Sequence, residues 1–492
     1  MNMRLEFTES LIQGLFGHEA AEDEDPKRLK EYYFKGTSYE QVNAEQAVRL
    51  LVGHKGIGKS ALFKVAMAEN EEQNNLSILV QPNDIGDLRI DQKDFLSRVR
   101  SWTSGLSRVI VQKTINFVGI RGKSLKQAMI DFEDYDLKIG DFIFDYFQEL
   151  INNNEYDISK KQFIENFLKV RKILVYIDDL DRGWQGKRED ITQISSLLNS
   201  VRDISRDNRG VSFKVSLRAD VYYLVRTSDE STDKIEGSVI WQSWTNHEIL
   251  VLLIKRMETF FGRKINEADL LKTSQIELAN KYLSIVMELR FTGVGKWENA
   301  PIHRILMSLI RKRPRDLVKL CTLAGRKTYE QKSSLIQTVD FKSIFEEYSQ
   351  GRIQDTINEY RSELPDIDKL LMNMRPTQKE RTTQQSYVYK TDELLKKIQN
   401  ISQNHVFKFA NSRTIADPKE LAAFLYKINF LTARRETDKG QIIRRYFEEN
   451  RYLSSTFVDF GFDWEIHPAY RWVLQPSDLD SIFRVLDLSS DD

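Results

Sequence analysis

Short apolar runs alternate along this chain with longer segments that have helical spacing. The apolar runs span residues 47–53, 76–82, 172–181, 211–220 and 237–244. The segments between them place apolar residues three and four positions apart, as helices with one buried face do. Strands that alternate with helices predict a doubly wound parallel sheet. We therefore expect an α/β core over residues 47–244, after a helical lead-in at residues 1–46.

One connection within this core is much longer than a simple crossover. Residues 85–170 separate the second and third predicted strands, whereas a crossover helix takes about 10–15 residues. Residues 94–113 and 138–154 within it both have helical apolar spacing. We interpret residues 85–170 as a helical insertion, which either forms a surface for a partner or covers the sheet.

The second half of the chain changes pattern. Residues 245 to about 351 have helical spacing throughout, and residues 375–387 are polar, contain a proline and lack periodicity, as linkers do. Residues beyond 387 combine helical patterns with one or two short strands, which is the outline of a winged helix. We predict a helical lid at residues 245–374 and a winged-helix-like domain at residues 388–492.

Composition narrows the function classes. A chain of 492 residues is too long for one core, and its 73 Lys and Arg balance its 73 Asp and Glu, which argues against a chain-wide binder of polyanions. The lone Cys321 excludes an internal disulfide and cysteine-based zinc sites. The N-terminus turns acidic, unlike a signal peptide, and no apolar run approaches the ~20 residues of a membrane span. We expect a soluble cytoplasmic protein without membrane contact.

Residues 53–60, GHKGIGKS, satisfy the phosphate-loop pattern G-x-x-x-x-G-K-[ST] between a predicted strand and a predicted helix. Glycines allow the close backbone approach and positive φ by which successive N–H groups surround an anion. Lys59 would reach the β- and γ-phosphates of ATP, and the Ser60 hydroxyl would ligate Mg²⁺. The predicted nucleotide-binding residues of the loop are Gly53, His54, Lys55, Gly56, Ile57, Gly58, Lys59, Ser60 and Ala61.

The other half of a phosphate-loop site is an acidic residue at the end of a neighbouring strand. ILVYIDDLD, residues 173–181, supplies it. Asp178 would hold Mg²⁺ through water, and Asp179 would orient or deprotonate the attacking water. Taken without the loop, the same pair could simply cap a buried strand.

Arginines offer positive charge for the transition state. Arg218 ends the fourth predicted strand, where it could contact the γ-phosphate as a sensor or lie solvated at the strand end. Arg313 and Arg315 flank Pro314 at the start of a predicted lid helix. There, Arg315 could touch the nucleotide and couple it to the lid, or be part of an ordinary basic helix start.

These motifs and their order resemble a known group. GHKGIGKS, LVYIDDLDR, KVSLR, WTNHEILVLL and RPRDL are similar to the motifs of prokaryotic STAND and KAP-like P-loop ATPases, in the AAA+-like division near the origin-recognition clade. The opening GLFGHEAAEDE and the closing WEIHPAY resemble a bacterial family of such ATPases often found beside antiviral defence genes. The resemblance is most specific over residues 10–65 and 172–325, and it does not cover the insertion well.

The resemblance implies roles at individual positions. It supports Lys59 and Ser60 on phosphate and magnesium, Asp178 and Asp179 as the Walker B pair, and Arg218 as first sensor. It also implies that Trp244 and Glu248 open the lid helix and that Pro314 and Arg315 stand at the lid's nucleotide contact. KAP members often insert membrane helices in the ATPase domain, and this insertion has none. STAND proteins usually add long repeat sensors, for which this chain has no room, so we expect it to work with a separate effector protein. We also expect a homo-oligomer.

The sequence leaves open the roles of Lys55 and of four C-terminal arginines. Lys55 lies four positions before Lys59, not the five of deviant Walker loops, so it either sits over the γ-phosphate or is solvated. In the C-terminal domain, arginines could bind DNA phosphates or form a charged surface. These C-terminal arginines are Arg434, Arg435, Arg444 and Arg445.

Three functions remain after these observations. The first is a Mg²⁺-dependent ATPase that acts as a nucleotide-driven switch or oligomer and controls an effector, in antiphage defence. The second is an ATP-dependent DNA-binding protein of the origin-recognition type. The third is a scaffold with a structural nucleotide. The neutral net charge disfavours the second and the complete acidic pair disfavours the third, so the first is preferred.

Overall fold

The structure is a computed structural model, and its description covers most of the chain. The described residues are 5–86, 94–118, 125–133, 138–153, 158–228, 230–381, 386–438, 441–453, 461–475, 482–483 and 486–488. They divide into two compact units. The core unit comprises Lys35–His54 and Lys59–Gln242, and the lid unit comprises Met1–Phe34, Lys55–Gly58 and Ser243–Asp492.

A five-stranded parallel sheet organises the core unit. Its strands lie in the order β2 (Leu76–Val80), β3 (Ile173–Ile177), β4 (Val211–Leu217), β1 (Val48–Val52) and β5 (Val239–Trp241). Every residue of β3 is buried, as expected for a continuous apolar run in a sheet covered on both faces. The predicted doubly wound parallel sheet is confirmed, with β4 between the loop-bearing strand β1 and the acidic strand β3.

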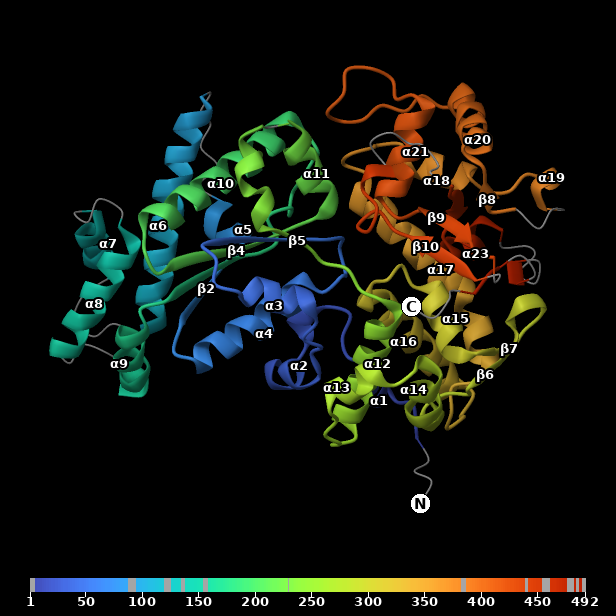
Figure 1. Ribbon diagram of the computed structural model, residues 1–492, viewed down its shortest axis with the longest axis horizontal. Coiled ribbons are helices and arrows are strands. Elements are labelled where there is room, and N and C mark those ends of the chain that lie inside the picture. Colours follow the sequence, from blue (N-terminus) through green and yellow to red (C-terminus); the bar gives the residue numbers. More distant parts are fainter. Residues whose placement is uncertain are drawn as a thin grey trace. The chain divides into compact units, whose positions relative to one another are not determined.

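Helices cover both faces of this sheet. Figure 1 shows α3 and α4 on one side and α10 and α11 on the other. The helices of the core unit are α3 (Thr37–Asn43), α4 (Lys59–Glu72), α5 (Pro82–Ile85), α6 (Phe95–Val118), α7 (Leu125–Glu133), α8 (Ile139–Asn153), α9 (Lys161–Val170), α10 (Arg188–Asp207) and α11 (Ala219–Ser228).

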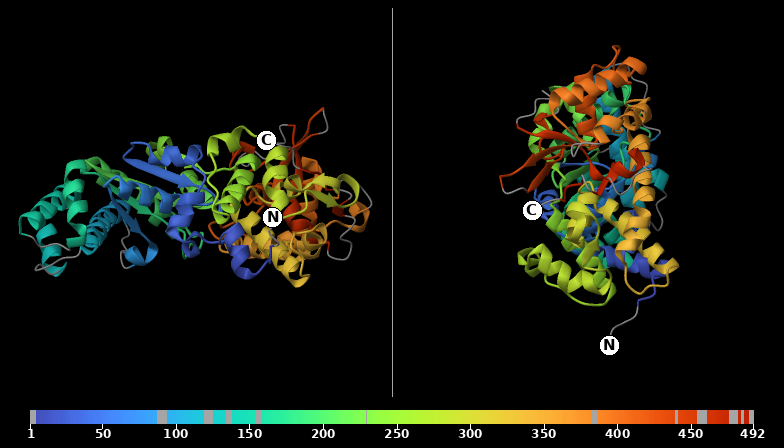
Figure 2. Two further views of the ribbon diagram at one scale, coloured as in Figure 1. Left: turned by 90° about the horizontal axis from the view of Figure 1, so that it is seen from below. Right: turned by 90° about the vertical axis from the view of Figure 1, so that its right-hand side faces the viewer.

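The predicted helical insertion is confirmed as the segment that holds α6 to α9. The long helix α6 packs along α10 and against β2, and α7 and α8 pack on α6. Aromatic side chains join these helices: the rings of Phe147 and Phe167 lie edge to face at 5.1 Å between centroids, and so do those of Phe132 and Phe142. The teal helices α7 to α9 form a group of their own in Figure 2.

The lid unit is mainly helical and includes the N-terminal helices. Helix α1 packs on α12 and α16, so the start of the chain joins helices some 240 or more residues later in the sequence. The helices are α1 (Glu9–Phe16), α2 (Pro26–Tyr32), α12 (Asn246–Phe260), α13 (Glu267–Lys272), α14 (Gln275–Tyr282), α15 (Ile302–Leu309), α16 (Pro314–Glu330), α17 (Thr338–Tyr360), α18 (Ile367–Asn373) and α19 (Gln378–Arg381).

The prediction that residues 245 to about 351 are helical throughout is wrong in one part. Strands β6 (Arg290–Thr292) and β7 (Glu298–Pro301) form an antiparallel hairpin within it. Gly295 takes a φ of 63° in the connection, and the Trp297 ring packs edge to face on Phe291 at 5.4 Å. Two glycines close together allow the turn, and the aromatic pair holds it, so tertiary packing overrides the helical spacing.

The C-terminal part is winged-helix-like and builds on an antiparallel sheet. The strands lie in the order β10 (Ile442–Arg445), β9 (Leu431–Glu436), β11 (Asp463–Ile466) and β8 (Val388–Tyr389). Helices α20 (Thr391–Asn404) and α21 (Pro418–Lys427) pack together, and α23 (Arg471–Leu474) packs on α17. Four residues of the predicted linker at 375–387, numbers 382–385, lie outside the described residues.

Short 3₁₀ helices complete the described structure. They are η1 (Ala21–Asp23), η3 (Ile158–Lys160), η4 (Glu230–Ser238), η5 (Leu283–Ile285), η6 (Gly295–Trp297) and η7 (Pro468–Tyr470). None of the helices in the described part of the chain has the length and apolar character needed to cross a bilayer.

Candidate functional site

The phosphate-loop motif connects β1 to α4, as predicted. Lys59 is the first residue of α4, and its ammonium donates to the carbonyl oxygens of Gly53 at 2.8 Å and His54 at 3.2 Å. Ser60 follows in the first helical turn. A cation and a hydroxyl therefore stand together at a helix N-terminus, which is the end that favours anions.

The glycines of the loop differ in conformation. Gly56 and Gly58 have φ values of 79° and 102°, in the region that favours glycine, and both support the predicted anion nest. The expectation of a positive φ at Gly53 is wrong. Its N–H donates to the Leu217 carbonyl at 3.1 Å, so it continues the parallel pairing of β1 with β4 before the loop begins.

The middle of the loop, Lys55–Gly58, groups with the lid unit. The buried indole of Trp244 donates its Nε1–H to the Ile57 carbonyl at 2.8 Å, and the Arg315 backbone N–H donates to the Gly56 carbonyl at 3.4 Å. A β-carbon placed at Gly56 would lie 3.0 Å from the Arg315 β-carbon. Glycine is thus required here for two reasons, its φ and the close approach of α16.

A buried arginine and a glutamate hold the next residue of the loop. Arg313 is 2% exposed, and its Nη1 donates to the Lys55 carbonyl at 3.3 Å. The Lys55 N–H in turn donates to the Glu359 carboxylate at 3.4 Å, and Arg313 and Glu359 form an ion pair at 3.6 Å. The Lys55 backbone is therefore clamped within the lid unit, while its side chain is exposed.

The acidic pair after β3 splits into a buried and an exposed carboxylate. Asp178 is 8% exposed, accepts a short hydrogen bond from the Ser216 hydroxyl, and accepts from the Asp179 N–H at 3.0 Å. Asp179 is exposed and has a φ of 63°, which L-residues seldom adopt. The chain thus turns sharply after β3, fixing Asp178 against β4 and leaving Asp179 accessible to water.

Arg218 follows β4, as predicted, but it is held by carboxylates. Its Nε and Nη2 donate to the two oxygens of Asp220 at 3.0 and 2.6 Å, and its Nη1 lies 3.6 Å from Asp181. Burial raises the pKa of the Asp181 carboxyl, an effect that the charges of Arg218 and Lys59 oppose. The predicted sensor arginine is therefore held by a forked ion pair, the geometry that guanidinium and carboxylate favour.

The predicted lid residues have local partners. Thr245 caps α12 by accepting from the Glu248 N–H at 3.1 Å, and the Glu248 carboxylate accepts from the Thr245 N–H at 2.8 Å. This reciprocal capping box satisfies backbone donors at the N-terminus of α12, and it makes Glu248 a capping residue. The Arg315 guanidinium donates to the Glu19 carbonyl at 3.1 Å, so α16 is fastened to the segment after α1.

The four C-terminal arginines do not form one basic surface. Arg444 is buried and paired with both oxygens of Glu465 at 2.7 and 3.0 Å, and Arg434 is buried and paired with Asp487 at 2.5 Å. The expectation that all four could face DNA is wrong for these two, because alternation along β9 and β10 turns them inward. Arg435 and Arg445 are exposed.

Several residues around the predicted site were not among the predicted site residues. Ser216 and Asp220 flank Arg218 on alternate positions of the same segment, and their polar character at a strand end was a usable signal. Glu359 lies more than 300 residues from the loop. No spacing rule in the sequence connects it to Lys55, so only the fold could reveal this contact.

A resident metal centre made of side chains alone does not occur in the described ranges, where no group of three or more His, Cys, Asp or Glu could hold an ion. Magnesium bound with a nucleotide has a different requirement, since phosphate oxygens and water supply most of its ligands. The Ser60 hydroxyl and the Asp178 carboxylate are hard oxygen donors of the kind that magnesium prefers.

Comparison with known proteins gives distant likenesses. No protein-family model matches the chain. The 80.3 kDa protein attributed to transposon gamma-delta of Escherichia coli (strain K12) is 22% identical over 502 residues, covering 92% of this chain and 66% of that protein. The chain thus spans slightly less than two thirds of this relative's length.

The solved structures that resemble this chain are also distant from it in sequence and in structure. A Walker-type ATPase of Pyrococcus abyssi has a TM-score of 0.39 at 11% identity, covering 90% of this chain and 96% of that one. The ORC2 protein of Aeropyrum pernix, in ADPNP–ADP complexes, has a TM-score of 0.39 at 12% identity, with 93% of each chain covered. The ORC1 protein of the same organism, in complex with DNA, has a TM-score of 0.32 at 11% identity, with 97% of each covered.

Proposed function

We propose that this chain is a P-loop ATPase that binds ATP with Mg²⁺ at residues 53–61 and hydrolyses it. The observation that carries the proposal is the placement of the Lys59 ammonium at the N-terminus of α4, against the Gly53 and His54 carbonyls. The same unit supplies a fixed carboxylate, Asp178, at the end of β3. The cation and the helix N-terminus can bind the phosphates of a nucleoside triphosphate, and the carboxylate can hold its metal ion.

The residues present fit magnesium and each has a distinct role. Ser60 and Asp178 would hold the ion, Asp178 through water, and magnesium would offset the charge of the phosphates. Asp179 is exposed and would orient the attacking water or take its proton. Water attack at the γ-phosphorus breaks the bond to the β-phosphate oxygen, giving ADP and phosphate. Arg218, preset by Asp220, would supply positive charge for the transition state.

We infer that nucleotide binding is coupled to the lid unit, so that the ATPase acts as a switch. Three hydrogen bonds within the lid unit, from Trp244, Arg313 and Arg315, end on carbonyls of the loop residues Lys55, Gly56 and Ile57. A bound phosphate that changes the conformation of these loop peptides would also change the hydrogen bonds that the lid residues make to them. The nucleotide would then favour one conformation of the lid unit over another, as a switch requires. A homo-oligomer and a separate effector, in the antiviral setting implied by the motif resemblance, complete this proposal.

A phosphate-release assay with purified protein tests the activity. We expect slow Mg²⁺-dependent release of phosphate from ATP, loss of nucleotide binding in Lys59→Ala, and retained binding without turnover in Asp179→Ala. Lys161→Ala, which changes an exposed lysine of α9, is the matched control and should behave like the parent chain. Turnover that persists in Lys59→Ala would contradict the proposed site.

DNA binding is a second candidate function. The relative from Escherichia coli is named for a transposon, and Arg435 and Arg445 are exposed on paired strands β9 and β10. If these arginines contact phosphates, Arg435→Ala with Arg445→Ala should weaken duplex binding and lower its salt dependence by about two counterions. Binding that is unchanged in this variant would rule out β9 and β10 as the contact surface.

A further inference from the structure

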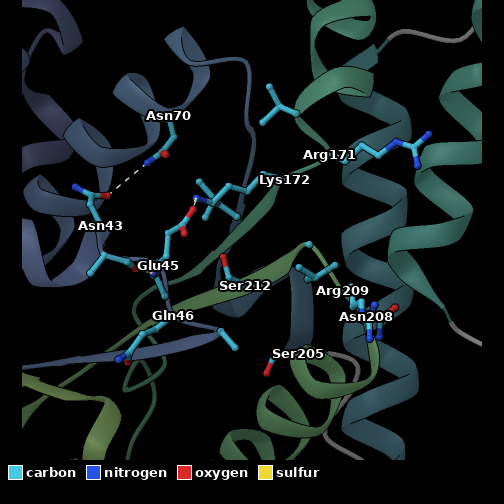
Figure 3. A pocket seen from close by; sticks show the side chains of 17 residues that line it. Asn43, Glu45, Gln46, Asn70, Arg171, Lys172, Ser205, Asn208, Arg209 and Ser212 are labelled. Atoms are coloured by element: carbon cyan, nitrogen blue, oxygen red, sulfur yellow. Dashed lines mark hydrogen bonds and ion pairs between the residues drawn. The ribbon is translucent and has the colours of Figure 1, made fainter.

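The core unit contains a cavity of about 400 Å³ at the amino ends of its parallel strands. The phosphate loop follows the carboxyl end of β1, whereas this cavity is lined by residues that precede β1, β3 and β4. Figure 3 shows Glu45 and Lys172 meeting in its middle, with Asn43 and Asn70 on one side and Ser212 nearby. The cavity is therefore distinct from the candidate nucleotide site.

Lys214 is the most unusual residue of the lining. Its side chain is on β4 and is only 2% exposed, and the acceptor of its ammonium is the Ala44 carbonyl at 3.4 Å. No carboxylate of the described residues forms an ion pair with it. Burying an ammonium without a paired carboxylate is unfavourable by several kcal/mol. A position of this kind calls for a functional explanation.

The surroundings of Lys214 add positive charge. Arg49 lies beside it in register on β1, and the Arg49 Nε is buried and finds no acceptor among the described residues. Burial, followed by the charges of Arg49 and Lys172, lowers the pKa of the Lys214 ammonium to about 7. The Lys172 ammonium pairs with exposed Glu45 at 3.1 Å, which is the one ion pair of this group in the described structure.

Apart from Arg209, an exposed lining residue ahead of β4, the remaining lining is neutral or turned aside. The Asn70 amide donates to the Ala66 carbonyl at 2.7 Å and to the Tyr176 hydroxyl at 3.1 Å, so α4 presents a fixed polar group. In Figure 3 the Arg171 side chain points away from the cavity, and its guanidinium lies 5.4 Å from the Phe144 ring centroid. The buried positive charge of the site thus comes from Lys214, with Arg49 next to it on β1.

We propose that this cavity is a second ligand site, which binds a small molecule bearing a tetrahedral dianion, as a phosphate monoester does. A dianion would pair with Lys214 and Lys172 and offset the charge of Arg49, for whose Nε the described residues offer no acceptor. The volume is near the lower end of small-molecule sites and exceeds the need of a bare oxyanion. Asn43 and Asn70 would bind the polar body of the ligand.

Calorimetric titration with two probes tests the site. The Lys59→Ala background removes binding at the phosphate loop, and sulfate and ribose 5-phosphate are then titrated into the whole chain. We expect one equivalent of each to bind, with ribose 5-phosphate at least tenfold tighter than sulfate. Equal affinities would assign the site to a free oxyanion and overturn the assignment to a monoester. Displacement of both probes by duplex DNA would overturn the small-molecule class.

Charge variants separate a real site from general ion effects. Lys214→Met should lose at least tenfold in affinity for both probes, and it removes a buried charge, so it should fold. Glu45→Gln removes the one carboxylate of the group and should tighten binding severalfold. Lys161→Met is the surface control. Binding that is indifferent to Lys214→Met, or undetectable at millimolar probe, would overturn the proposal.

Proton uptake gives an independent readout at pH 8. The groups that face Lys214 are Arg49 of β1, Lys172 and Tyr176 on the β3 segment, Glu45 ahead of β1, and neutral Asn70 of α4. Since sulfate does not titrate in this range, charging of Lys214 should appear as proton uptake in titrations with two buffers of different ionisation enthalpy. Uptake that persists in Lys214→Met would contradict the role of this lysine.

Discussion

Trp244 donates the Nε1–H of its indole to the carbonyl of Ile57 at 2.8 Å, inside the phosphate loop. The two residues are 187 positions apart in the chain. Trp244 comes directly before the N-cap of α12, so the start of the main lid helix and the loop backbone share a hydrogen bond.

Trp244→Phe keeps an aromatic ring but removes this donor. A buried hydrogen bond contributes about 1 kcal/mol, so the affinity for a non-hydrolysable ATP analogue should fall about fivefold. Titration calorimetry measures the effect. Trp241→Phe, on strand β5, leaves the loop contacts intact and should bind like the parent chain. Equal affinities in both variants would exclude a role of the Trp244 bond in loop geometry.

Arg218→Lys keeps the charge after β4 but removes the fork that matches Asp220. Because a lysine cannot hold the two carboxylate oxygens in this way, we expect kcat for ATP hydrolysis to fall at least tenfold. The Kd for the ATP analogue should stay within threefold of the parent value. Arg188→Lys, at the exposed start of α10, is the matched control. A rise in Kd with unchanged kcat would assign Arg218 to ground-state binding.

Asp316 connects two buried arginines in the lid unit. Its oxygens accept from Arg311 at 2.7 and 2.9 Å and from Arg352 at 2.6 Å, and all three side chains are buried. Asp316→Asn should destabilise the lid unit by about 3–5 kcal/mol in urea unfolding, because two guanidinium groups lose their carboxylate. Asp355→Asn removes an exposed carboxylate paired with Arg352 and should change stability by less than about 1 kcal/mol.

The same network predicts how acid affects the lid unit. The charges of Arg311 and Arg352 outweigh burial and hold the pKa of the Asp316 carboxyl well below its usual value. The stabilisation is therefore complete above the unfolded-state pKa of about 4 and is lost as the pH falls through the folded-state value. Urea titrations below pH 4 should show a smaller pH dependence in Asp316→Asn than in the parent chain. Parallel curves would contradict this assignment.

Lys214 predicts that the stability of the core unit also rises with pH, but in a higher pH range. Its pKa is about 7 in the folded chain and 10.5 in its ordinary state, so the unfolded chain binds more protons between these values. Stability should therefore rise with pH above 7, by at most about 1.4 kcal/mol per unit from this group. Lys214→Met should be more stable than the parent chain at pH 7, and the difference should shrink by pH 9. A constant difference would show that Lys214 keeps its ordinary pKa.

The sequence by itself determined the parts whose signals are local. Residues 53–60 specify a strand, a glycine loop and a helix start, because glycine conformations and helix capping act over a few neighbouring residues. The five strands of the core sheet were readable as mostly apolar runs, and β3 is unbroken because a strand buried on both faces favours apolar side chains throughout. Asp178 and Arg218 could be placed at strand ends by the same reasoning.

Only the tertiary structure decided which charges meet. Arg434 and Arg444 look like surface residues in the sequence, yet the register of β9 and β10 turns both inward to acidic partners. Lys55 is clamped by Glu359, and Lys214 is buried beside Arg49 without an ion-paired carboxylate in the described part of the chain. Such contacts join residues far apart in the chain. They depend on the register and packing of whole elements, and no local pattern of residue types encodes them.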